Sequence, residues 1–396
     1  MTQPIERVAV VGAGIAGLSI AIALHDAGVP VVVLEQASRL GEVGAGIGLT
    51  ASSLRFFDEH GLGERILSTA VKADKGIVTY TLDGGRREAG HTGARSVHRR
   101  DLLDALLAGI PADRIRLGAR VTGVTQDADG VTLVLADGSV ERTAAVIGAD
   151  GIHSVVQPAV TASAPPTFSG VVAYRGLVPA ARLPRWPLDE SRMFVGTGRH
   201  FLVFGVRRGE LLNFVGFVPA DFDVRESWSQ PGDPARLAEE FAGFPEDVRR
   251  FIAEIDTTWR WGLHDHEPLE RWTNGRIAVA GDAAHAMLPF AGMGANSAIE
   301  DAIVLGAVLA DRSGPELPAA LADYERIRAD RARFVQRYTR RAGLLQDGHD
   351  ERFAARDDLA DAREVEAWLR RYDVRDAVAA WRSGDPLPAL PAGAPV

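Results

Sequence analysis

The sequence has 396 residues, of which 46% are hydrophobic and 24% are charged, a composition typical of a globular protein with room for an extensive core and two domains. The formal net charge of -9 argues against nucleic acid or an anionic membrane surface as a partner. The absence of cysteine excludes disulfides, thiolate nucleophiles and Cys-ligated metals, and no His, Asp or Glu group has metal-ligand spacing, so no metal is expected. The start of the sequence does not resemble a signal peptide and no apolar run approaches the roughly 20 residues of a membrane span, so we expect a cytoplasmic enzyme.

The first 35 residues have the pattern of a βαβ unit that binds a dinucleotide. An apolar strand ends in Gly12-Ala13-Gly14-Ile15-Ala16-Gly17, an Ala-rich helix follows, and a second apolar strand ends in Glu35. Gly12 allows a tight turn, Gly14 lets the backbone approach a pyrophosphate, and Gly17 lets helix and strand pack closely. Glu35 can accept hydrogen bonds from a ribose diol, and its charge would repel a 2′-phosphate. We therefore predict NAD or FAD rather than NADP, and this segment leaves the choice between the two open.

The chain from residue 41 to residue 154 contains further candidates for ligand contact. A second glycine cluster over residues 41–50 indicates close approach of the backbone to a ligand or a packed helix, with a flexible loop as the alternative. Residues 77–97 alternate like a hairpin, and Arg99 then opens a helix, where it is either a phosphate or ribityl contact or an exposed charge. Strands are expected over 115–123, 131–135 and 144–147.

Residues 161–269 differ in character, with frequent proline and concentrated aromatics. Alternating segments over 171–177, 192–194, 201–206 and 211–218 predict an antiparallel sheet, and one amphipathic helix is expected over 237–255. On the strand that starts at His200, the period of two places His200, Leu202 and Phe204 on one face. His264 and His266 fall in a polar loop, where we expect them to be solvated.

The C-terminal half returns to a buried strand over 276–280 that ends in Gly281-Asp282, followed by a Gly-rich loop and a long helix from near Ser297. Asp282 can bind a polyol, and the helix start can stabilise negative charge that develops on an electron-accepting ring. FAD fits this second site, whereas NAD would not need it.

These segments predict an α/β protein with a Rossmann-like FAD-binding domain, an inserted, mainly antiparallel β-sheet substrate domain and a C-terminal helical segment. The expected boundaries are 1–76, 97–160 and 270–345 for the FAD-binding domain, 77–96 and 161–269 for the substrate-binding domain, 346–383 for the C-terminal helices, and 384–396 for a Pro-rich, disordered tail.

Taken together, the motifs resemble the class A flavin-dependent monooxygenases, the aromatic hydroxylases that include para-hydroxybenzoate, salicylate and 6-hydroxynicotinate hydroxylases. The resemblance runs through about residue 345. It rests on the first glycine motif with Glu35, Gly44-Ala45-Gly46-Ile47, His98-Arg99-Arg100-Asp101-Leu102, the segment 148–154, and the segments 281–285 and 300–302. The sequence departs from the family at Gln157, where Arg is frequent, and at Met293-Gly294, where Gln-Gly is frequent.

The resemblance implies that Glu35 binds the adenosine ribose, Arg99 the ribityl-phosphate region and Asp282 the ribityl chain. Gly294, Ala295 and Asn296 would face the pyrimidine edge of the flavin, and Asp150 belongs to a motif assigned to both FAD and NAD(P)H. The cofactor-binding residues predicted in this way are Gly12, Ala13, Gly14, Ile15, Ala16, Gly17, Glu35, Gln36, Ala45, Gly46, Arg99, Val121, Asp150, Asp282, Pro289, Gly294, Ala295 and Asn296.

In such enzymes NADH or NADPH reduces FAD, and a flavin C4a-hydroperoxide then transfers oxygen to an electron-rich ring. The implied partners are a small phenolic or heteroaromatic substrate and O2, with the protein a monomer or homodimer. We predict substrate contacts from His200, Phe204, Phe290 and Met293. His200 is the catalytic candidate, and a histidine bonded only to backbone or water is the alternative.

Two other functions remain open. A flavoprotein of the same fold could epoxidise or reduce a terpenoid or polyketide, since the sequence shows few obvious acid-binding residues for the pocket. A flavin-binding module without catalytic turnover is the other alternative.

Overall fold

The computed structural model describes residues 5–41, 45–90, 93–162, 164–196, 198–220, 230–346 and 362–391. Its first large sheet has six strands, of which five are parallel and the edge strand β18 is antiparallel. In spatial order the strands are β18 (Thr273–Asn274), β19 (Ile277–Val279), β11 (Ala145–Gly148), β1 (Val8–Val11), β2 (Val31–Leu34) and β7 (Ile115–Arg116).

Helices and a small sheet cover the six-stranded sheet. Strands β1, β2, β11 and β19 are buried along their whole length, which explains their continuous apolar sequence. One core joins this sheet to α1 (Ile15–Asp26), α4 (Arg99–Ala108) and α8 (Gly294–Leu309), and to a three-stranded antiparallel sheet. That sheet contains β8 (Val121–Gln126), β9 (Val131–Leu135) and β10 (Val140–Thr143).

The second large sheet has eight strands, and neighbours are antiparallel except for the parallel pair β13 and β4. The mainly antiparallel sheet predicted from the sequence is therefore confirmed. In spatial order the strands are β16 (Pro231–Gly232), β17 (Thr258–Asp265), β12 (Thr167–Pro179), β15 (Leu211–Pro219), β14 (Arg199–Val206), β13 (Ser191–Gly196), β4 (Ile77–Thr81) and β5 (Arg86–Glu88).

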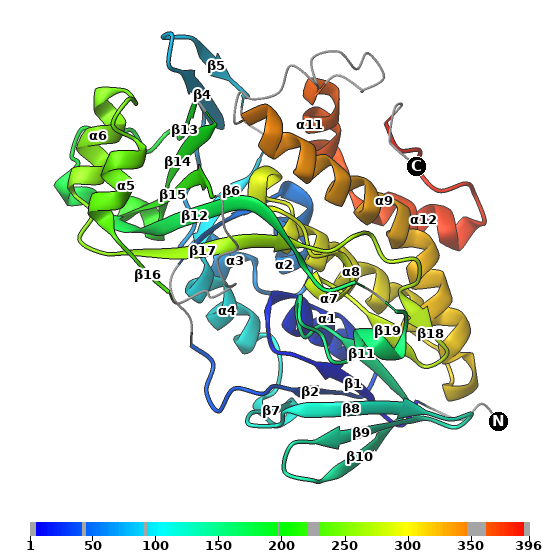
Figure 1. The fold of residues 1–396 in the computed structure, drawn as a ribbon. Helices are drawn as coiled ribbons and strands as arrows, with labels where there is room; N and C mark the ends of the chain where they lie inside the picture. The colour runs from blue at the N-terminus through cyan, green and yellow to red at the C-terminus, as the bar shows by residue number, and fades with distance from the viewer. Residues whose placement is uncertain are drawn as a thin grey trace.

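The two faces of the eight-stranded sheet pack against different partners. The outer face presents Phe201 and Phe214 to α5 (Pro234–Glu240) and α6 (Glu246–Ala253), which lie on the side away from the six-stranded sheet (Figure 1). The inner face presents Phe217 and Trp261 to the loop before α8 and to α9 (Leu317–Gln346). The inner face is therefore the one that faces the six-stranded sheet and the helices packed on it.

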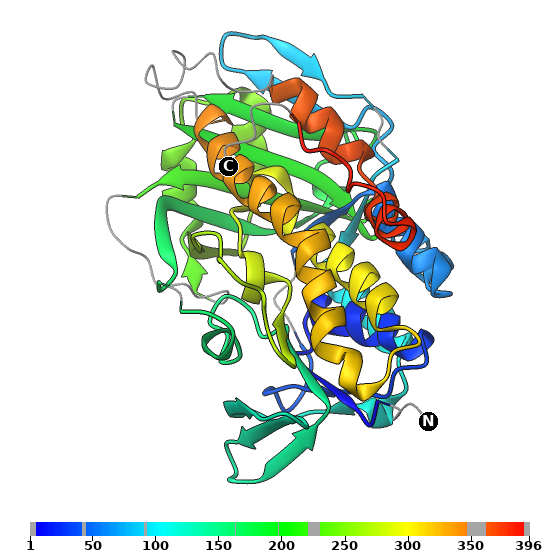
Figure 2. The same ribbon diagram turned by 90° about the vertical axis from the view of Figure 1, so that its right-hand side faces the viewer.

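Helix α9 connects the two sheets. Its first half places Leu321 and Tyr324 in the core of the six-stranded sheet, and its second half places Phe334 and Tyr338 against the inner face of the other sheet. Figure 2 shows α9 running past both sheets, with α11 (Ala362–Arg371) and α12 (Val374–Ser383) beside it. None of the helices in the described ranges combines the length and apolar character needed to cross a membrane.

The remaining elements are short. They are β3 (Gly46–Leu49), β6 (Arg95–His98), α2 (Ala51–Glu59), α3 (Gly63–Leu67), α7 (Asp282–His285), η1 (Ala112–Arg114), η2 (Gln157–Ala159), η3 (Ala180–Arg182), η4 (Arg207–Gly209), η5 (Pro289–Ala291) and η6 (Gly314–Glu316).

The structure differs from the sequence prediction in several places. The strand expected over 115–123 is two strands in different sheets, because Gly118 turns the chain with a φ of 70°. The helix expected over 237–255 is two helices: α5 ends at Glu240, and Pro245, which has no N–H to donate within a helix, directly precedes α6.

Two further differences concern β6 and the tail. Strand β6 pairs with β3 rather than extending the 77–88 hairpin. In the tail, Leu387 and Leu390 pack against the two cores, which differs from the disorder expected there. Residues 392–396 lie outside the described part of the chain.

Candidate functional site

Four adjacent parallel strands of the six-stranded sheet end at the same edge, and each is followed by a predicted cofactor residue. In the order β2, β1, β11 and β19, these are Glu35, the turn Gly12–Gly17, Asp150 and Asp282. Open α/β sheets bind ligands outside the carboxyl ends of their strands. Three interstrand spacings separate β2 from β19, roughly 14 Å at about 4.8 Å each. Glu35 and Asp282 therefore suit opposite ends of one extended ligand.

The three glycines of the first motif are required for different reasons. A Cβ on Gly17 would lie 1.9 Å from the Gly12 carbonyl oxygen, and Gly12 has a φ of 102° with its own Cβ position 2.5 Å from the Ala149 oxygen. In the part of the chain that the structure describes, no atom lies within 4 Å of a Cβ placed on Gly14. Gly14 also precedes the first residue of α1 and has no side chain with which to cap it. Packing requires Gly12 and Gly17, whereas Gly14 leaves the helix N-terminus open to an anion.

Glu35 is held beside this turn by backbone amides. Its two oxygens accept hydrogen bonds from Ala13 N at 2.7 Å and Ala37 N at 2.8 Å. Each carboxylate oxygen has a second lone pair, so ribose hydroxyls remain possible partners. Gln36 next to it is exposed, and Val121 is buried at the start of β8.

Asp150 organises the turn that follows β11. Its carboxylate accepts hydrogen bonds from Ser154 Oγ at 2.5 Å and Val155 N at 2.8 Å, and burial raises its pKa. Gln157 at the end of this turn donates from Nε2 to Ala283 O at 2.9 Å. The residue that replaces the family's frequent Arg therefore ties the Asp150 turn to the segment that carries Asp282.

Asp282 is accessible to solvent, yet burial by the surrounding protein raises its pKa, against the opposing charges of His285 and Arg99. These two facts agree if the carboxylate is recessed but still open on one side. The charge of Arg99 acts on Asp282, and Arg99 N donates to Ala45 O at 2.8 Å. The structure thus brings Arg99, Ala45 and Asp282, all predicted cofactor residues, into one neighbourhood.

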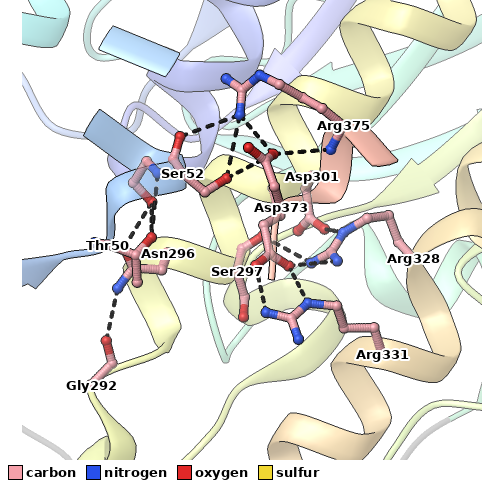
Figure 3. Close-up of polar contacts among 12 residues, drawn as sticks. Thr50, Ser52, Gly292, Asn296, Ser297, Asp301, Arg328, Arg331, Asp373 and Arg375 are labelled. Carbon is pink, nitrogen blue, oxygen red and sulfur yellow. Dashed lines mark hydrogen bonds and ion pairs between the residues drawn. The ribbon is translucent and has the colours of Figure 1, made fainter. Parts of the chain in front are cut away.

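The start of α8 is held in place by Asn296. Its Nδ2 donates to Gly48 O and Gly292 O, both at 2.9 Å, while its Oδ1 accepts from Thr50 N at 2.9 Å and Ser53 Oγ at 2.7 Å. Figure 3 shows Asn296 with Thr50 and Gly292. The side chain predicted to face the flavin is thus fully used in joining two loops. At the same helix start, no described residue comes within 4 Å of a Cβ placed on Gly294, Ala295 is half-buried and Pro289 is exposed.

Beneath the edge lies a buried group of charges on α8 and α9, here called the ion cluster and formed by Glu300, Asp301, Arg328 and Arg331. Arg331 makes two hydrogen bonds to Glu300, at 2.9 and 2.7 Å, and Arg328 Nε donates to Asp301 at 2.9 Å (Figure 3). Asp301 also accepts from Gly281 N at 2.8 Å and is 2.6 Å from His285 Nε2. The cluster therefore fixes the residue that precedes Asp282.

The predicted substrate residues lie on the inner face of the eight-stranded sheet and on the loop opposite it. His200 stacks on Phe217 with ring centroids 4.2 Å apart, and Phe290 of η5 lies 5.5 Å from His200 and 5.3 Å from Phe217. Met293 joins Phe290 and Phe217 in the same core. Phe204, further along β14, lies so close to Gly46 that a Cβ there would be 2.3 Å from its ring.

Two polar residues on this face were missed from the sequence. Arg175 of β12 is 2% exposed and its guanidinium lies 4.6 Å from the Trp261 ring centroid. Asn213 of β15 is fully buried and accepts a hydrogen bond from Gly46 N at 2.7 Å. The inner face of the eight-stranded sheet is therefore richer in polar groups than the sequence suggested. The alternation of side chains along a strand could have assigned each of these residues to one face of the sheet. It does not show which of the two faces is the inner one.

The expectation for His264 and His266 was wrong. Strand β17 extends as far as Asp265, so His264 is half-buried in the sheet with its ring 5.3 Å from Phe168. His266 is buried, and its Nε2 lies 2.8 Å from Ile152 O.

The residues at the edge fit FAD. Gly14 directly before α1 and Gly294 at the start of α8 have no atom of the described residues within 4 Å of their Cβ positions. The recessed carboxylate of Asp282 is close enough to Arg99 for its charge to act on it. FAD has phosphates that could bind at the N-terminus of α1 and a polyol chain that could bind Asp282.

Comparisons with known proteins agree with this geometry. The family described as FAD binding domain matches residues 6–341. The chain is 35% identical to the 3-amino-4-hydroxybenzoate 2-monooxygenase PtnB3 of Streptomyces platensis, over 93% of this chain and 96% of that protein.

Solved structures are similar over nearly the whole chain. A salicylate hydroxylase in a substrate complex has a TM-score of 0.81 at 30% identity, covering 98% of this chain and 99% of that one. Klebsiella pneumoniae HpxO complexed with FAD and uric acid has a TM-score of 0.78 at 29% identity, covering 94% and 95%. The chain therefore belongs to the FAD-binding-domain family of class A flavin-dependent aromatic hydroxylases, and it is an FAD-dependent monooxygenase.

Proposed function

We propose that the protein uses NADH or NADPH, O2 and bound FAD to hydroxylate a small, electron-rich aromatic compound, phenolic or heteroaromatic. One observation supports this most directly. The aromatic group of His200, Phe217 and Phe290 spans the inner face of the eight-stranded sheet and the loop that leads into α8. A flat ring bound there would lie against the proposed flavin site.

We assign the cofactor contacts along the strand-end edge. Glu35 would bind the adenosine ribose, the N-terminus of α1 the pyrophosphate, and Arg99 and Asp282 the ribityl region, with Gly294 and Ala295 at the pyrimidine edge. When bound and reduced, FAD supplies the activation of O2 for transfer of one oxygen atom.

The protein's own residues would exclude water and orient the ring. Phe204, Phe217, Phe290 and Met293 supply apolar contact, which keeps competing water away from the reacting carbon. His200 would accept the proton of a ring hydroxyl at one of its ring nitrogens, which raises the electron density of the ring and favours attack at carbon.

The sheet division suggests how these roles are distributed. The six-stranded sheet with its helices would form the FAD-binding domain, and the eight-stranded sheet would form the substrate-binding domain. A cytoplasmic location and a monomeric or dimeric state stay predictions.

The test is NADH and NADPH oxidation by FAD-reconstituted protein with four probes: 3-amino-4-hydroxybenzoate, salicylate, 6-hydroxynicotinate and urate. We expect at least one probe to accelerate oxidation and to yield a product heavier by one oxygen atom in mass spectrometry. A flavin-containing protein that no probe stimulates would contradict the proposal and favour an epoxidase of another substrate class or a non-catalytic flavin-binding module.

His200→Ala tests the assigned base. We expect unchanged FAD content, slower hydroxylation and more hydrogen peroxide per NAD(P)H consumed. The control is His264→Ala, on the opposite face of the same sheet, which should leave coupling unchanged. Wild-type coupling in His200→Ala would remove this residue from the site.

A further inference from the structure

Of the two polar atoms in the side-chain amide of Asn213, only the oxygen makes a hydrogen bond to the described residues. The residue is fully buried in β15, and its Oδ1 accepts a hydrogen bond from Gly46 N at 2.7 Å. Because only the oxygen can accept from a backbone N–H, this bond determines which end of the amide is Nδ2. Among the described residues Nδ2 has no hydrogen-bond partner.

A buried amide nitrogen with two unused hydrogens costs stability. Nearly all buried polar groups in folded proteins are satisfied, and an exception calls for a ligand, an ion or a water. The other amide of this region, Asn296, illustrates the rule because all four of its hydrogen-bonding positions are occupied. The free end of Asn213 therefore indicates a missing acceptor.

The position of Asn213 identifies what that acceptor belongs to. In the sheet register Asn213 is opposite Phe204 of β14 and Leu177 of β12, on the same face as Val215 and Phe217. This is the inner face that carries the proposed ring-binding aromatics. On its other side, a Cβ on Gly46 would lie 2.9 Å from Asn213 Cγ. The amide thus stands between the Gly46 loop and the apolar face.

We infer that Asn213 is a substrate-binding residue, whose Nδ2 donates a hydrogen bond to an oxygen substituent of the aromatic substrate. This inference rests on the proposed function. Asn213 Oδ1 already accepts a hydrogen bond from the Gly46 loop of the proposed flavin site. Its Nδ2 can therefore donate to a substrate on the apolar inner face of the sheet, where an oxygen on the aromatic ring would need a hydrogen-bond donor. Anchored to Gly46, the amide would fix one oxygen of the substrate relative to the flavin and so select which carbon is hydroxylated.

Asn213→Asp is the most direct test, because Asp has nearly the same shape and keeps an oxygen for Gly46 N while it replaces the donor by an acceptor. With FAD-loaded enzyme and the most active of the four probes, we expect KM to rise by about tenfold or more, the value of one hydrogen bond to substrate. FAD content should stay at the wild-type level, because the bond to Gly46 N is kept.

Asn213→Ala covers the case in which the new charge prevents folding, and we expect a similar rise in KM. The control is Thr143→Val, which removes a buried hydroxyl bonded to Ala145 O in the three-stranded sheet; its KM should match the wild type. The product ratio should also change in the Asn213 variants if more than one ring carbon can react.

The outcomes separate this inference from the proposed function. A wild-type enzyme that is stimulated by a probe, together with Asn213 variants whose KM is within twofold of it, overturns the inference alone. Loss of FAD instead of a rise in KM also overturns it, because the amide would then serve the flavin. A wild-type enzyme that no probe stimulates overturns the proposed function and this inference with it.

Discussion

The pKa values of the carboxylates are shifted in opposite directions at the strand-end edge and in the ion cluster beneath it. Asp301 in the cluster is fully buried, and burial alone would raise its pKa, yet His285 and Arg328 hold that pKa below its usual range. Asp282 at the edge is accessible, yet burial by the surrounding protein raises its pKa because the nearby charges do not compensate. Partners rather than accessibility decide which acid ionises easily.

The difference indicates what each region is for. Charges that stabilise the fold are paired within the protein, as between Arg331 and Glu300, and Arg331 also lies 3.5 Å from the ring centroid of Tyr372 near the C-terminus. A carboxylate with no complete set of partners suits a ligand that brings its own donors. The two regions are joined where Asp301 accepts the hydrogen bond of Gly281 N.

Asp301→Asn should have the largest effect, because it leaves the buried His285 without its acid and removes one of the two acids that pair with the buried Arg328. Breaking a buried pair in this way costs about 3–5 kcal/mol, which urea unfolding of the FAD-free protein would measure. The control is Asp330→Asn, whose pair with Arg333 is exposed and should cost less than about 1 kcal/mol. Equal losses in the two variants would show that the cluster is no more important than a surface pair.

Asp282→Asn should have the opposite profile. It removes a carboxylate that the fold ionises with difficulty, so the free energy of unfolding of the FAD-free protein should not fall. FAD affinity should fall by roughly 10- to 150-fold, the value of a hydrogen bond to a charged group, as measured by fluorescence titration of FAD. Unchanged affinity would contradict the ribityl assignment.

The edge could be predicted from the sequence because its signals are local. Gly12, Gly14 and Gly17 fall within six residues, Glu35 directly follows an apolar strand, and Asp282 comes three residues after the end of another. Each motif reports the end of one strand, and the parallel arrangement of the sheet then brings the ends together.

The ion cluster and Asn213 could not be predicted in the same way. Arg331 meets Glu300 only because α8 and α9 pack side by side, and the two residues are 31 positions apart. For Asn213, the period of two groups it with Val215 and Phe217, but only the packing of β15 between β12 and β14 shows that this face is buried against Gly46. Likewise, polar neighbours suggested a loop around His264, whereas pairing with β12 extends the strand through it.

Asp301 and Asp282 should contribute to the pH dependence of the free energy of unfolding with opposite signs. The lowered pKa of Asp301 gives stability that is present above about pH 3.9, the unfolded value, and is lost as the pH falls through the folded value. The raised pKa of Asp282 gives stability below about pH 3.9 that is lost as the pH rises through its folded value.

On acidification from pH 7, the FAD-free wild type should therefore gain stability relative to Asp282→Asn. Relative to Asp301→Asn it should lose stability, chiefly below about pH 4. Urea unfolding at a series of pH values would measure both differences. Two differences that change in the same direction would contradict the contrast between the regions.

Gly14→Ala should cause the smallest change in stability. Its φ of -75° suits any residue, and the added methyl group would meet none of the described residues within 4 Å. The free energy of unfolding of the FAD-free protein should therefore change by no more than about 1 kcal/mol. Gly17→Ala is the control, because its methyl group would stand 1.9 Å from the Gly12 oxygen and the backbone would have to move. If the open space at Gly14 is where a pyrophosphate approaches the start of α1, Gly14→Ala should fold normally and bind FAD more weakly. A variant that folds and keeps wild-type FAD affinity would place the phosphates elsewhere along the edge.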